Sequence, residues 1–339
     1  MVITLQQHIQ PETLHQLKAL LTLKQVNFSY LEKRNLIVIE KSVDPSVLEG
    51  LDGIERIDLI ASPYQLSSIK FKKETHFLVN GISIGSRFAN LIAGPCSVES
   101  EKQIFDTAEF LAKNGIRFIR GGAYKPRTSP YAFRGLGVDG LKILKEAATK
   151  YNLSVVTELM DLSLLDQLME YSDIIQIGSR NMSNFYLLAE LGKIDKPVML
   201  KRGMSARISE WLLAADYILS GGNEKVILCE RGVRSFDPEV RNLMDVAAIP
   251  MIQSLSHLPI IADPSHGTGS AKFVAPLALA SMVAGANGLM VEIHPDPSKA
   301  LSDSQQAMSF EAFENLLQDI RKLESAIQKP IDATYEAAQ

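Results

Sequence analysis

The sequence predicts a (β/α)8 barrel preceded by a small ferredoxin-like α+β domain and a β-hairpin. Three observations support this fold class. Eight short apolar runs, each suited to a buried strand, follow one another from Leu91 onward. Amphipathic stretches separate them, and strand starts recur every 20 to 37 residues, as a strand, loop and crossover helix require. All eight runs end on residues suited to binding metal or phosphate, which a barrel would gather on one face.

The eight runs share a polar or charged C-terminal end. They read LIAGPCS (91–97), RFIRGGAYKPRTS (117–129), SVVTE (154–158), IIQIGSR (174–180), PVMLKRG (197–203), VILCERG (226–232), PIIADPSH (259–266) and GLMVEIH (288–294). Between them, apolar residues three and four positions apart predict helices, most clearly at 100–115, 139–151 and 163–171. The pattern at 310–328 predicts a final helix that closes the barrel.

Residues 1–62 have a different pattern and form a separate predicted domain. Strands are expected at 2–5, 27–33, 35–41 and 54–60, with helices at 11–22 and 44–51. This βαββαβ order is the ferredoxin-like pattern.

Residues 63–88 are predicted to hold a linker and a hairpin. Ala61 to Glu74 has the composition of a linker, and Asn80-Gly81 between two short apolar runs is a strong hairpin signal. We expect this hairpin to close the bottom of the barrel. The catalytic barrel is assigned to 89–330 and a C-terminal tail to 331–339.

Composition excludes several classes of protein. The 339 residues are 46% hydrophobic and 22% charged, and a net charge of -4 argues against a nucleic-acid surface. Two cysteines and an N-terminus without a basic, apolar leader favour a reducing cytoplasm. The one long apolar stretch, 273–293, is interrupted by Pro276, Gly285, Asn287 and Gly288, so a helix and a strand are expected there and not a membrane span.

Three strand-end residues and one residue in the loop after the eighth strand form a candidate metal site. Cys96, His266, Glu292 and Asp303 are distant in sequence but would converge at the barrel mouth. A thiolate, an imidazole and two carboxylates suit one divalent ion of Mn, Fe, Co or Zn and suit Mg²⁺ poorly. Taken singly, each residue also has a structural interpretation as a buried thiol, a turn residue or a surface charge. Cys229 lies inside the sixth strand and is interpreted as packing.

A second set of strand-end residues is cationic. Burying such charges costs several kcal/mol each unless an anion compensates, so the set predicts a strongly anionic substrate with more than one phosphate. A solvated helix face explains Lys142 or Lys145, but explains strand-terminal arginines poorly. No Walker-type loop and no GxGxxG motif is present, so neither a nucleoside triphosphate nor NAD is indicated. The cationic residues are Arg120, Lys125, Arg127, Arg180, Lys201 and Arg231.

Two loops add further polar groups. KPRTSP places Arg127 beside Thr128 and Ser129, so one loop offers guanidinium, hydroxyl and backbone donors to a phosphate. DPSHGTG combines Asp263 and His266 with glycines that permit close backbone approach, although those residues also serve as ordinary turn punctuation.

At these motifs the chain resembles the 3-deoxy-D-arabino-heptulosonate 7-phosphate (DAHP) synthases, specifically the class I-beta subgroup with an N-terminal ferredoxin-like domain. The resemblance runs from about Leu91 to the last helix through eight ordered motifs: IAGPCSVES, RGGAYKPRTSPYAFRGLG, VVTE, IIQIGSRN, LKRG, ILCERG, DPSH and VEIHPDPSKALSD. It implies a transferase that opens the shikimate pathway of chorismate and aromatic amino acid biosynthesis by condensing phosphoenolpyruvate with erythrose 4-phosphate.

The resemblance also implies roles for individual residues. It assigns the metal to the four residues named above, and the phosphate of erythrose 4-phosphate to Arg127 and Thr128. Lys125 is the expected proton donor, with His266 helping to position water and Cys96 counted with both as catalytic. Phosphoenolpyruvate is assigned to Arg120, Lys125, Arg180, Lys201 and Arg231, and Ser179 and His266 are counted as further substrate-binding residues.

Two alternatives stay open at the level of sequence. The sibling 3-deoxy-D-manno-octulosonate 8-phosphate (KDO8P) synthases use arabinose 5-phosphate, but carry a KANRS-like loop where this chain reads KPRTS. A barrel without catalytic activity that serves an amino-acid-sensing domain is the second. The resemblance further implies a homotetramer and inhibition by tyrosine or phenylalanine at the N-terminal domain, where no motif could be matched residue by residue.

Overall fold

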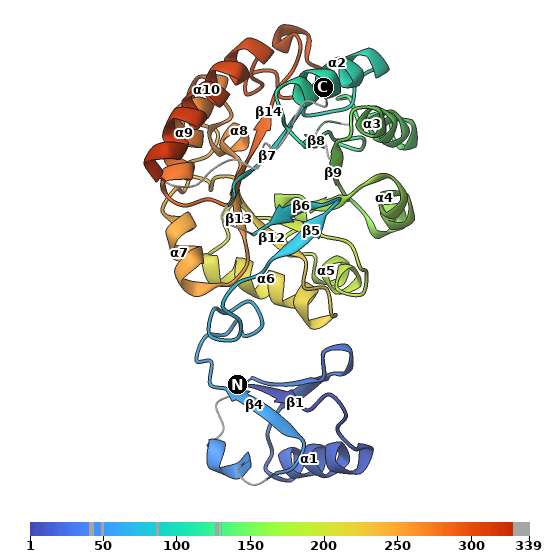
Figure 1. Cartoon of the computed structure of the whole chain (residues 1–339), viewed down its shortest axis with the longest axis vertical. Helices are drawn as coiled ribbons and strands as arrows, with labels where there is room; N and C mark the ends of the chain where they lie inside the picture. The colour runs from blue at the N-terminus through green and yellow to red at the C-terminus, as the bar shows by residue number, and fades with distance from the viewer. Residues whose placement is uncertain (41–43, 49–50, 86–87, 126–128, 130, 328–339) are drawn as a thin grey trace.

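The computed structural model describes residues 1–40, 44–48, 51–85, 88–125, 129 and 131–327, and it contains a barrel and a smaller sheet (Figure 1). Eight parallel strands form the closed barrel, a four-stranded antiparallel sheet lies outside it, and two further strands form a hairpin. The predicted fold class is therefore confirmed.

The barrel strands follow chain order around the ring, and the last strand pairs with the first. Every strand residue except Glu158 is buried, because helices cover the outside and side chains fill the inside; this is why the runs are continuously apolar and do not alternate. The bounds are β7 (Asn90–Gly94), β8 (Phe118–Arg120), β9 (Ser154–Glu158), β10 (Ile174–Ile177), β11 (Val198–Lys201), β12 (Val226–Glu230), β13 (Ile260–Ala262) and β14 (Gly288–Glu292).

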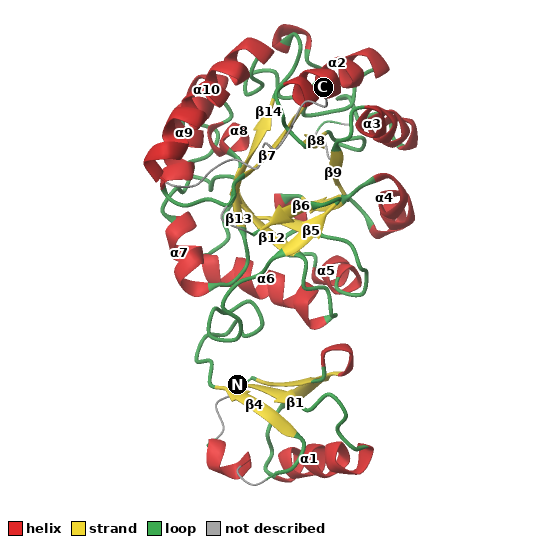
Figure 2. Ribbon diagram, in the orientation of Figure 1, coloured by secondary structure: helices red, strands yellow, loops and turns green. Residues whose placement is uncertain are grey.

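Helices surround the barrel strands (Figure 2). They are α2 (Glu101–Lys113), α3 (Val138–Lys150), α4 (Leu165–Tyr171), α5 (Phe185–Leu191), α6 (Ile208–Ser220), α7 (Ala248–Leu255), α8 (Pro264–Thr268), α9 (Ala271–Val283) and α10 (Phe310–Ile327), with 3-10 turns η3 (Leu162–Leu164), η4 (Ser179–Asn181) and η5 (Pro297–Lys299). Pro276 lies inside α9 and does not interrupt it; the helix instead ends just before Gly285, whose φ is +101°. Within the described part of the chain, no helix is both long enough and apolar enough to span a membrane.

The N-terminal sheet has the ferredoxin-like strand order β2-β3-β1-β4, with antiparallel pairing between neighbours. Its elements are β1 (Val2–Leu5), α1 (Pro11–Leu23), β2 (Phe28–Leu31), η1 (Glu32–Arg34), β3 (Leu36–Ile39), η2 (Pro45–Leu48) and β4 (Ile54–Asp58). The second predicted strand ends early because Glu32–Arg34 form a 3-10 turn that Asn35 closes in the left-handed region. The second predicted helix is likewise only a 3-10 turn. Helix α1 covers the face of the sheet turned away from the barrel (Figure 1).

The segment predicted as a linker packs against the barrel. The carboxylate of Asp216 in α6 accepts hydrogen bonds from the backbone N–H groups of Gln65 at 2.6 Å, Leu66 at 3.1 Å and Ser67 at 2.7 Å. Tyr64 to Ser68 is buried. The N-terminal domain is thus joined to the barrel through an anchored segment.

The hairpin β5 (Phe77–Val79) and β6 (Ile82–Ile84) closes the amino-terminal end of the barrel. Asn80 and Gly81 both have positive φ, as a two-residue hairpin turn requires. Its apolar side chains pack with those that the strands point into the barrel, including Cys229. The Asn80 amide also donates to the Ser154 hydroxyl, at the first residue of β9, over 3.1 Å.

Candidate active site

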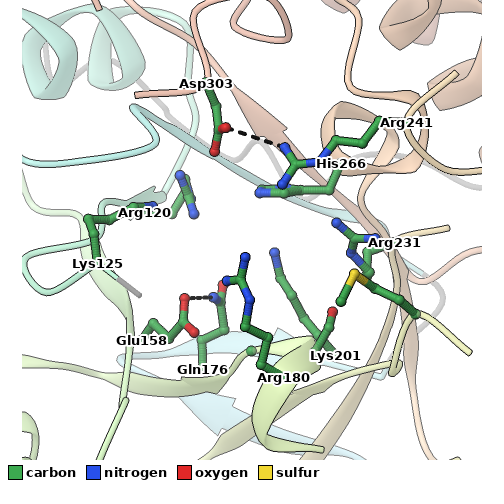
Figure 3. A pocket seen from close by; sticks show the side chains of 13 residues that line it. Arg120, Lys125, Glu158, Gln176, Arg180, Lys201, Arg231, Arg241, His266 and Asp303 are labelled. Atoms are coloured by element: carbon green, nitrogen blue, oxygen red, sulfur yellow. Dashed lines mark hydrogen bonds and ion pairs between the residues drawn. The ribbon is translucent and has the colours of Figure 1, made fainter. Parts of the chain in front are cut away.

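A polar cavity of about 100 Å³ lies at the carboxyl-terminal mouth of the barrel (Figure 3). Strand ends and the loops that follow them supply its walls, as expected for this fold. The lining residues are Arg120, Lys125, Glu158, Gln176, Gly178, Ser179, Arg180, Lys201, Met204, Arg231, Arg241, His266 and Asp303.

Three of the four predicted metal ligands form one tight cluster beside this cavity. One ligand atom each from Cys96, Glu292 and Asp303 lies within 4.8 Å of the others, and Cys96 Sγ is 3.1 Å from Asp303 Oδ2. Cys96 follows β7, Glu292 ends β14, and Asp303 lies in the loop after η5. Parallel strand ends therefore bring together ligands that are about 200 residues apart in sequence.

His266, the fourth predicted ligand, adjoins this cluster through Glu292. Its Nε2 is 3.5 Å from Glu292 Oε1, while its Nδ1 is 2.8 Å from Asp263 Oδ2. A carboxylate only accepts, so Nδ1 carries the proton and Nε2 keeps its lone pair. Burial lowers the pKa of His266, against the opposing charges of Asp263 and Glu292. The imidazole thus presents a neutral nitrogen toward the cluster.

The pKa values of the cluster's side chains are compatible with binding of a divalent cation. Burial, helped by the charge of Glu292, raises the pKa of the Cys96 thiol to about 11. Burial alone would raise the pKa of Asp303, but the hydrogen bond from Cys96 and the positive charges of Lys125 and Arg241 oppose it, and that pKa is lowered to about 2. A bound divalent ion would favour the thiolate over the thiol. Sulfur, nitrogen and two carboxylates together match transition-metal or zinc coordination.

Two buried cations are paired with carboxylates of the site. Arg120 Nη1 donates to Glu292 Oε1 at 2.8 Å and to the Pro95 carbonyl at 2.7 Å. Lys201 Nζ donates to Asp263 Oδ2 at 2.6 Å. Because Asp263 supplies the compensating charge, the burial of Lys201 does not by itself require an anionic substrate, contrary to the sequence argument.

One donor of Arg120 is unpaired. Its Nε is buried and has no hydrogen-bond partner within the described ranges. A buried guanidinium N–H left without an acceptor costs free energy.

Lys125 lies between the cavity and the candidate metal cluster. Its Nζ is 2.9 Å from both the sulfur and the carbonyl oxygen of Cys96. A Cβ at Gly122 would meet Lys125 Cδ at 2.8 Å and the Cys96 carbonyl at 3.0 Å, so glycine there permits the approach. Arg127 and Thr128, predicted to bind the second phosphate, lie outside the described residues.

The walls retain a positive excess after these pairings. Among the described residues, six lysines and arginines line the cavity, against Glu158 and Asp303 in its wall and Asp263 and Glu292 paired behind it. Six cations against four carboxylates leave two positive charges, with His266 neutral. The cavity therefore suits a small, multiply charged anion.

Comparison with known proteins identifies the family of this chain. Residues 67–329 match the DAHP synthetase I family. The chain belongs to this family.

Individual relatives agree with the family assignment. The chain is 49% identical to a phospho-2-dehydro-3-deoxyheptonate aldolase of Thermotoga maritima over 280 residues, covering 82% of this chain and 83% of the relative. A crystal structure of that enzyme type from Thermotoga maritima, described as a DAHP synthase, superposes with a TM-score of 0.80 at 43% identity, covering 98% of this chain and 99% of the other.

A second branch is more distant. A 2-dehydro-3-deoxyphosphooctonate aldolase of Francisella tularensis subsp. holarctica is 32% identical over 256 residues, covering 70% of this chain and 92% of the relative. Similarity to the heptonate enzymes is therefore higher and extends over more of the chain.

Within this family framework, the structure gathers the described members of the predicted site at one mouth. Arg120, Lys125, Ser179, Arg180, Lys201, Arg231 and His266 line the cavity. Their contacts with substrate stay predictions.

Sequence reasoning missed five of the described residues that line the cavity: Glu158, Gln176, Gly178, Met204 and Arg241. Glu158 and Gln176 hydrogen-bond to each other over 3.3 Å. They lie on the strand-end motifs SVVTE and IIQIGSR, from which only Ser179 and Arg180 were predicted as site residues. Arg241, whose Nη1 is 3.3 Å from Asp303 Oδ1, and Met204 lie in loops beyond the strand ends. No local sequence pattern predicts that these loops lie over the mouth of the barrel.

Proposed function

We propose that this chain condenses phosphoenolpyruvate with D-erythrose 4-phosphate and water to give DAHP and phosphate, the reaction that begins the shikimate pathway. The observation that carries the proposal is a mixed sulfur, nitrogen and oxygen cluster beside a cavity with six lysines and arginines. Family membership and 49% identity to a heptonate aldolase support this assignment.

Phosphoenolpyruvate carries a phosphate and a carboxylate, and the cationic cavity is the place proposed for it. Arg120, which lines this cavity, is one donor for such a group. Ser179, Arg180 and Lys201 lie on the wall formed by β10 and β11 and the turn after β10, and Arg231 follows β12. Arg127 and Thr128 are proposed to take the phosphate of the aldose.

Cys96, His266, Glu292 and Asp303 are proposed to hold one divalent ion of Mn, Fe, Co or Zn. The neutral Nε2 of His266 and the two ionised carboxylates suit this role. When bound, such an ion supplies Lewis-acid polarisation of the aldehyde oxygen.

The chain's own groups then handle the remaining steps. The cations orient phosphoenolpyruvate so that its C3 forms a bond to the aldehyde carbon. Lys125, whose Nζ is 2.9 Å from Cys96 Sγ, is proposed to protonate the oxygen of that former aldehyde. Water adds at C2, the C2–O bond to phosphate breaks, and the cationic wall receives the departing phosphate. His266 is proposed to help position the water.

The KDO8P reaction is the closest chemical alternative. It uses the same donor with arabinose 5-phosphate, and its relatives are 32% identical to this chain against 49% for the heptonate enzyme. The catalytically inactive barrel is disfavoured because all four candidate ligands and the predicted cations of the described mouth are present.

A regulatory role is proposed for the N-terminal domain. The sheet has its own apolar core and is tied to the barrel through the Asp216-anchored segment, so a ligand on it has a route to the barrel. We propose tyrosine or phenylalanine as the effector, in a homotetramer acting in the cytoplasm. Turnover by the full chain with added tyrosine or phenylalanine, against tryptophan as control, tests the effector, and sedimentation tests the assembly.

Consumption of phosphoenolpyruvate tests the main proposal. Metal-loaded protein is given erythrose 4-phosphate, arabinose 5-phosphate or no aldose, before and after EDTA. Consumption with the four-carbon sugar alone, lost with EDTA and restored by Mn²⁺, is the expected result. Preference for the five-carbon sugar would assign the chain to the KDO8P branch, and no consumption would support the inactive barrel.

A further inference from the structure

Two loops at the barrel mouth are fastened together by a buried polar network outside the site described above. One loop follows β7 and carries Cys96; the other follows β14 and carries Asp303. Glu99 on the first and His294 on the second have side chains only 9% and 7% exposed and lie 3.3 Å apart, from Glu99 Oε2 to His294 Nε2.

The hydrogen bond to Nδ1 of His294 determines which ring nitrogen carries the proton. The backbone N–H of Asp296 donates to His294 Nδ1 at 3.0 Å, so Nδ1 is an acceptor. The ring proton of the neutral histidine must then be on Nε2, which faces Glu99. The histidine therefore donates to the carboxylate.

Glu99 accepts from the same loop a second time. Its Oε1 receives the backbone N–H of Leu301 at 2.9 Å. One carboxylate thus binds two donors that flank η5 on the Asp303 loop. Only a group with two acceptor oxygens satisfies both, because a glutamine amide would turn its N–H₂ toward one of these donors.

A pair of serines fastens the same loops directly beside the candidate ligands. The hydroxyls of Ser97 and Ser302 hydrogen-bond to each other, and both residues are buried. Ser97 follows Cys96 and Ser302 precedes Asp303, whose φ of +48° is costly for a residue other than glycine. External contacts must hold the backbone there.

We propose that Glu99 and His294 are positioning residues that hold the Asp303 loop against the Cys96 loop, so that both side chains face one cation. This inference rests on the metal site of the proposed function. Partners of this kind typically change metal affinity by about 10- to 100-fold when removed.

Three substitutions distinguish positioning from general stability. Glu99→Gln leaves one donor of the Asp303 loop facing an amide N–H. His294→Asn retains an acceptor for the Asp296 N–H but cannot reach Glu99. His294→Gln places its amide nitrogen near the position of Nε2 and keeps the bridge. Glu101→Gln, at an exposed glutamate that begins α2, is the matched control.

The experiment is a Co²⁺ titration of each full-length protein after metal removal, followed through the cobalt–thiolate absorption band. We expect Glu99→Gln and His294→Asn to weaken Co²⁺ binding about 10- to 100-fold, while His294→Gln and Glu101→Gln stay within about threefold of wild type. At saturating metal, kcat of the weakened variants should return close to the wild-type value.

The outcomes separate the two proposals. A wild-type band with unchanged affinity in Glu99→Gln and His294→Asn overturns the positioning role alone. Equal weakening by His294→Gln and His294→Asn also overturns it, because the bridge would then be irrelevant. If the wild-type protein gives no cobalt–thiolate band, the metal assignment fails and this inference fails with it. If Glu99→Gln does not fold, the comparison of His294→Asn with His294→Gln still tests the positioning role.

Discussion

The two ends of the barrel are built from the same eight strands but are completed differently. At the amino-terminal end, the β5–β6 hairpin fills the barrel with apolar side chains such as Val79, Ile82 and Ile84. At the carboxyl-terminal end, charged side chains surround a cavity, and buried ion pairs such as Lys201–Asp263 fix their positions. The difference indicates that stability and chemistry are separable in this chain: changes at the bottom should alter unfolding, and changes at the mouth should alter turnover.

The largest expected effect is at the mouth. Lys125→Met removes the proposed proton donor, so kcat should fall by about 10²- to 10⁴-fold while the thermal midpoint changes little. Lys142→Met, on the exposed face of α3, is the matched control and should keep full turnover. A folded Lys125→Met protein with wild-type kcat would refute the proton-donor role.

The corresponding change at the bottom is Ile84→Ala. Ile84 is 1% exposed within the barrel interior, so the truncation should lower the free energy of unfolding by about 2–5 kcal/mol. Leu78→Ala on the same hairpin, at a residue 67% exposed, should cost far less. Denaturant titration measures both, and kcat should stay within about twofold. A large loss of kcat in folded Ile84→Ala protein would show that the two ends are coupled.

A pH-dependent effect is expected at the amino-terminal end. His257, which precedes β13, lies 2.7 Å from the Leu66 carbonyl and 2.6 Å from the Thr75 hydroxyl, and burial lowers its pKa from 6.5 to about 4. Between these values the unfolded chain binds a proton that the folded chain does not, so stability falls as the pH drops from about 6.5 toward 4. The gap corresponds to at most about 3 kcal/mol.

His257→Gln tests this linkage because its amide can still donate to the Leu66 carbonyl but does not titrate. The free energy of unfolding should fall less between pH 7 and pH 4.5 in the variant than in the wild type, by denaturant titration at both pH values. An equal fall in both proteins would place the titrating group elsewhere.

The smallest expected change in stability is at Arg241, on the rim of the mouth. The Arg241 side chain is 48% exposed in its ion pair with Asp303, so Arg241→Gln should change stability by less than about 1 kcal/mol. Because Arg241 lines the cavity, KM for a phosphorylated substrate should rise on the order of tenfold. Unchanged KM values at low salt would restrict Arg241 to its contact with Asp303.

The two ends of the barrel also show which features could be predicted from the sequence. Strand-end motifs predicted which residues would meet at the mouth, because a parallel barrel leaves one place for carboxyl strand ends. Asn80-Gly81 predicted the hairpin, because both turn positions require positive φ. These are local patterns with a single structural solution.

Contacts between side chains on different barrel strands could not be predicted from the sequence. The LKRG and DPSH motifs do not indicate that Lys201 contacts Asp263. From the sequence alone, the compensating charge for buried Lys201 was therefore expected from an anionic substrate. Arg241 and Met204 lie in loops without periodicity, and their place over the mouth depends on the packing of the whole barrel. In the described part of the helix expected at 44–51, Pro45–Leu48 form a 3-10 turn.

The central claim is that Cys96, His266, Glu292 and Asp303 hold one metal ion beside the cationic cavity. Anomalous diffraction from crystals grown with Mn²⁺ and phosphoenolpyruvate tests it most directly. The account predicts one strong peak within about 2.0–2.5 Å of Cys96 Sγ, His266 Nε2 and an oxygen of both Glu292 and Asp303, with phosphoenolpyruvate against Arg120 and Lys201. A well-occupied metal bound by other groups, or no peak at this cluster, would contradict it.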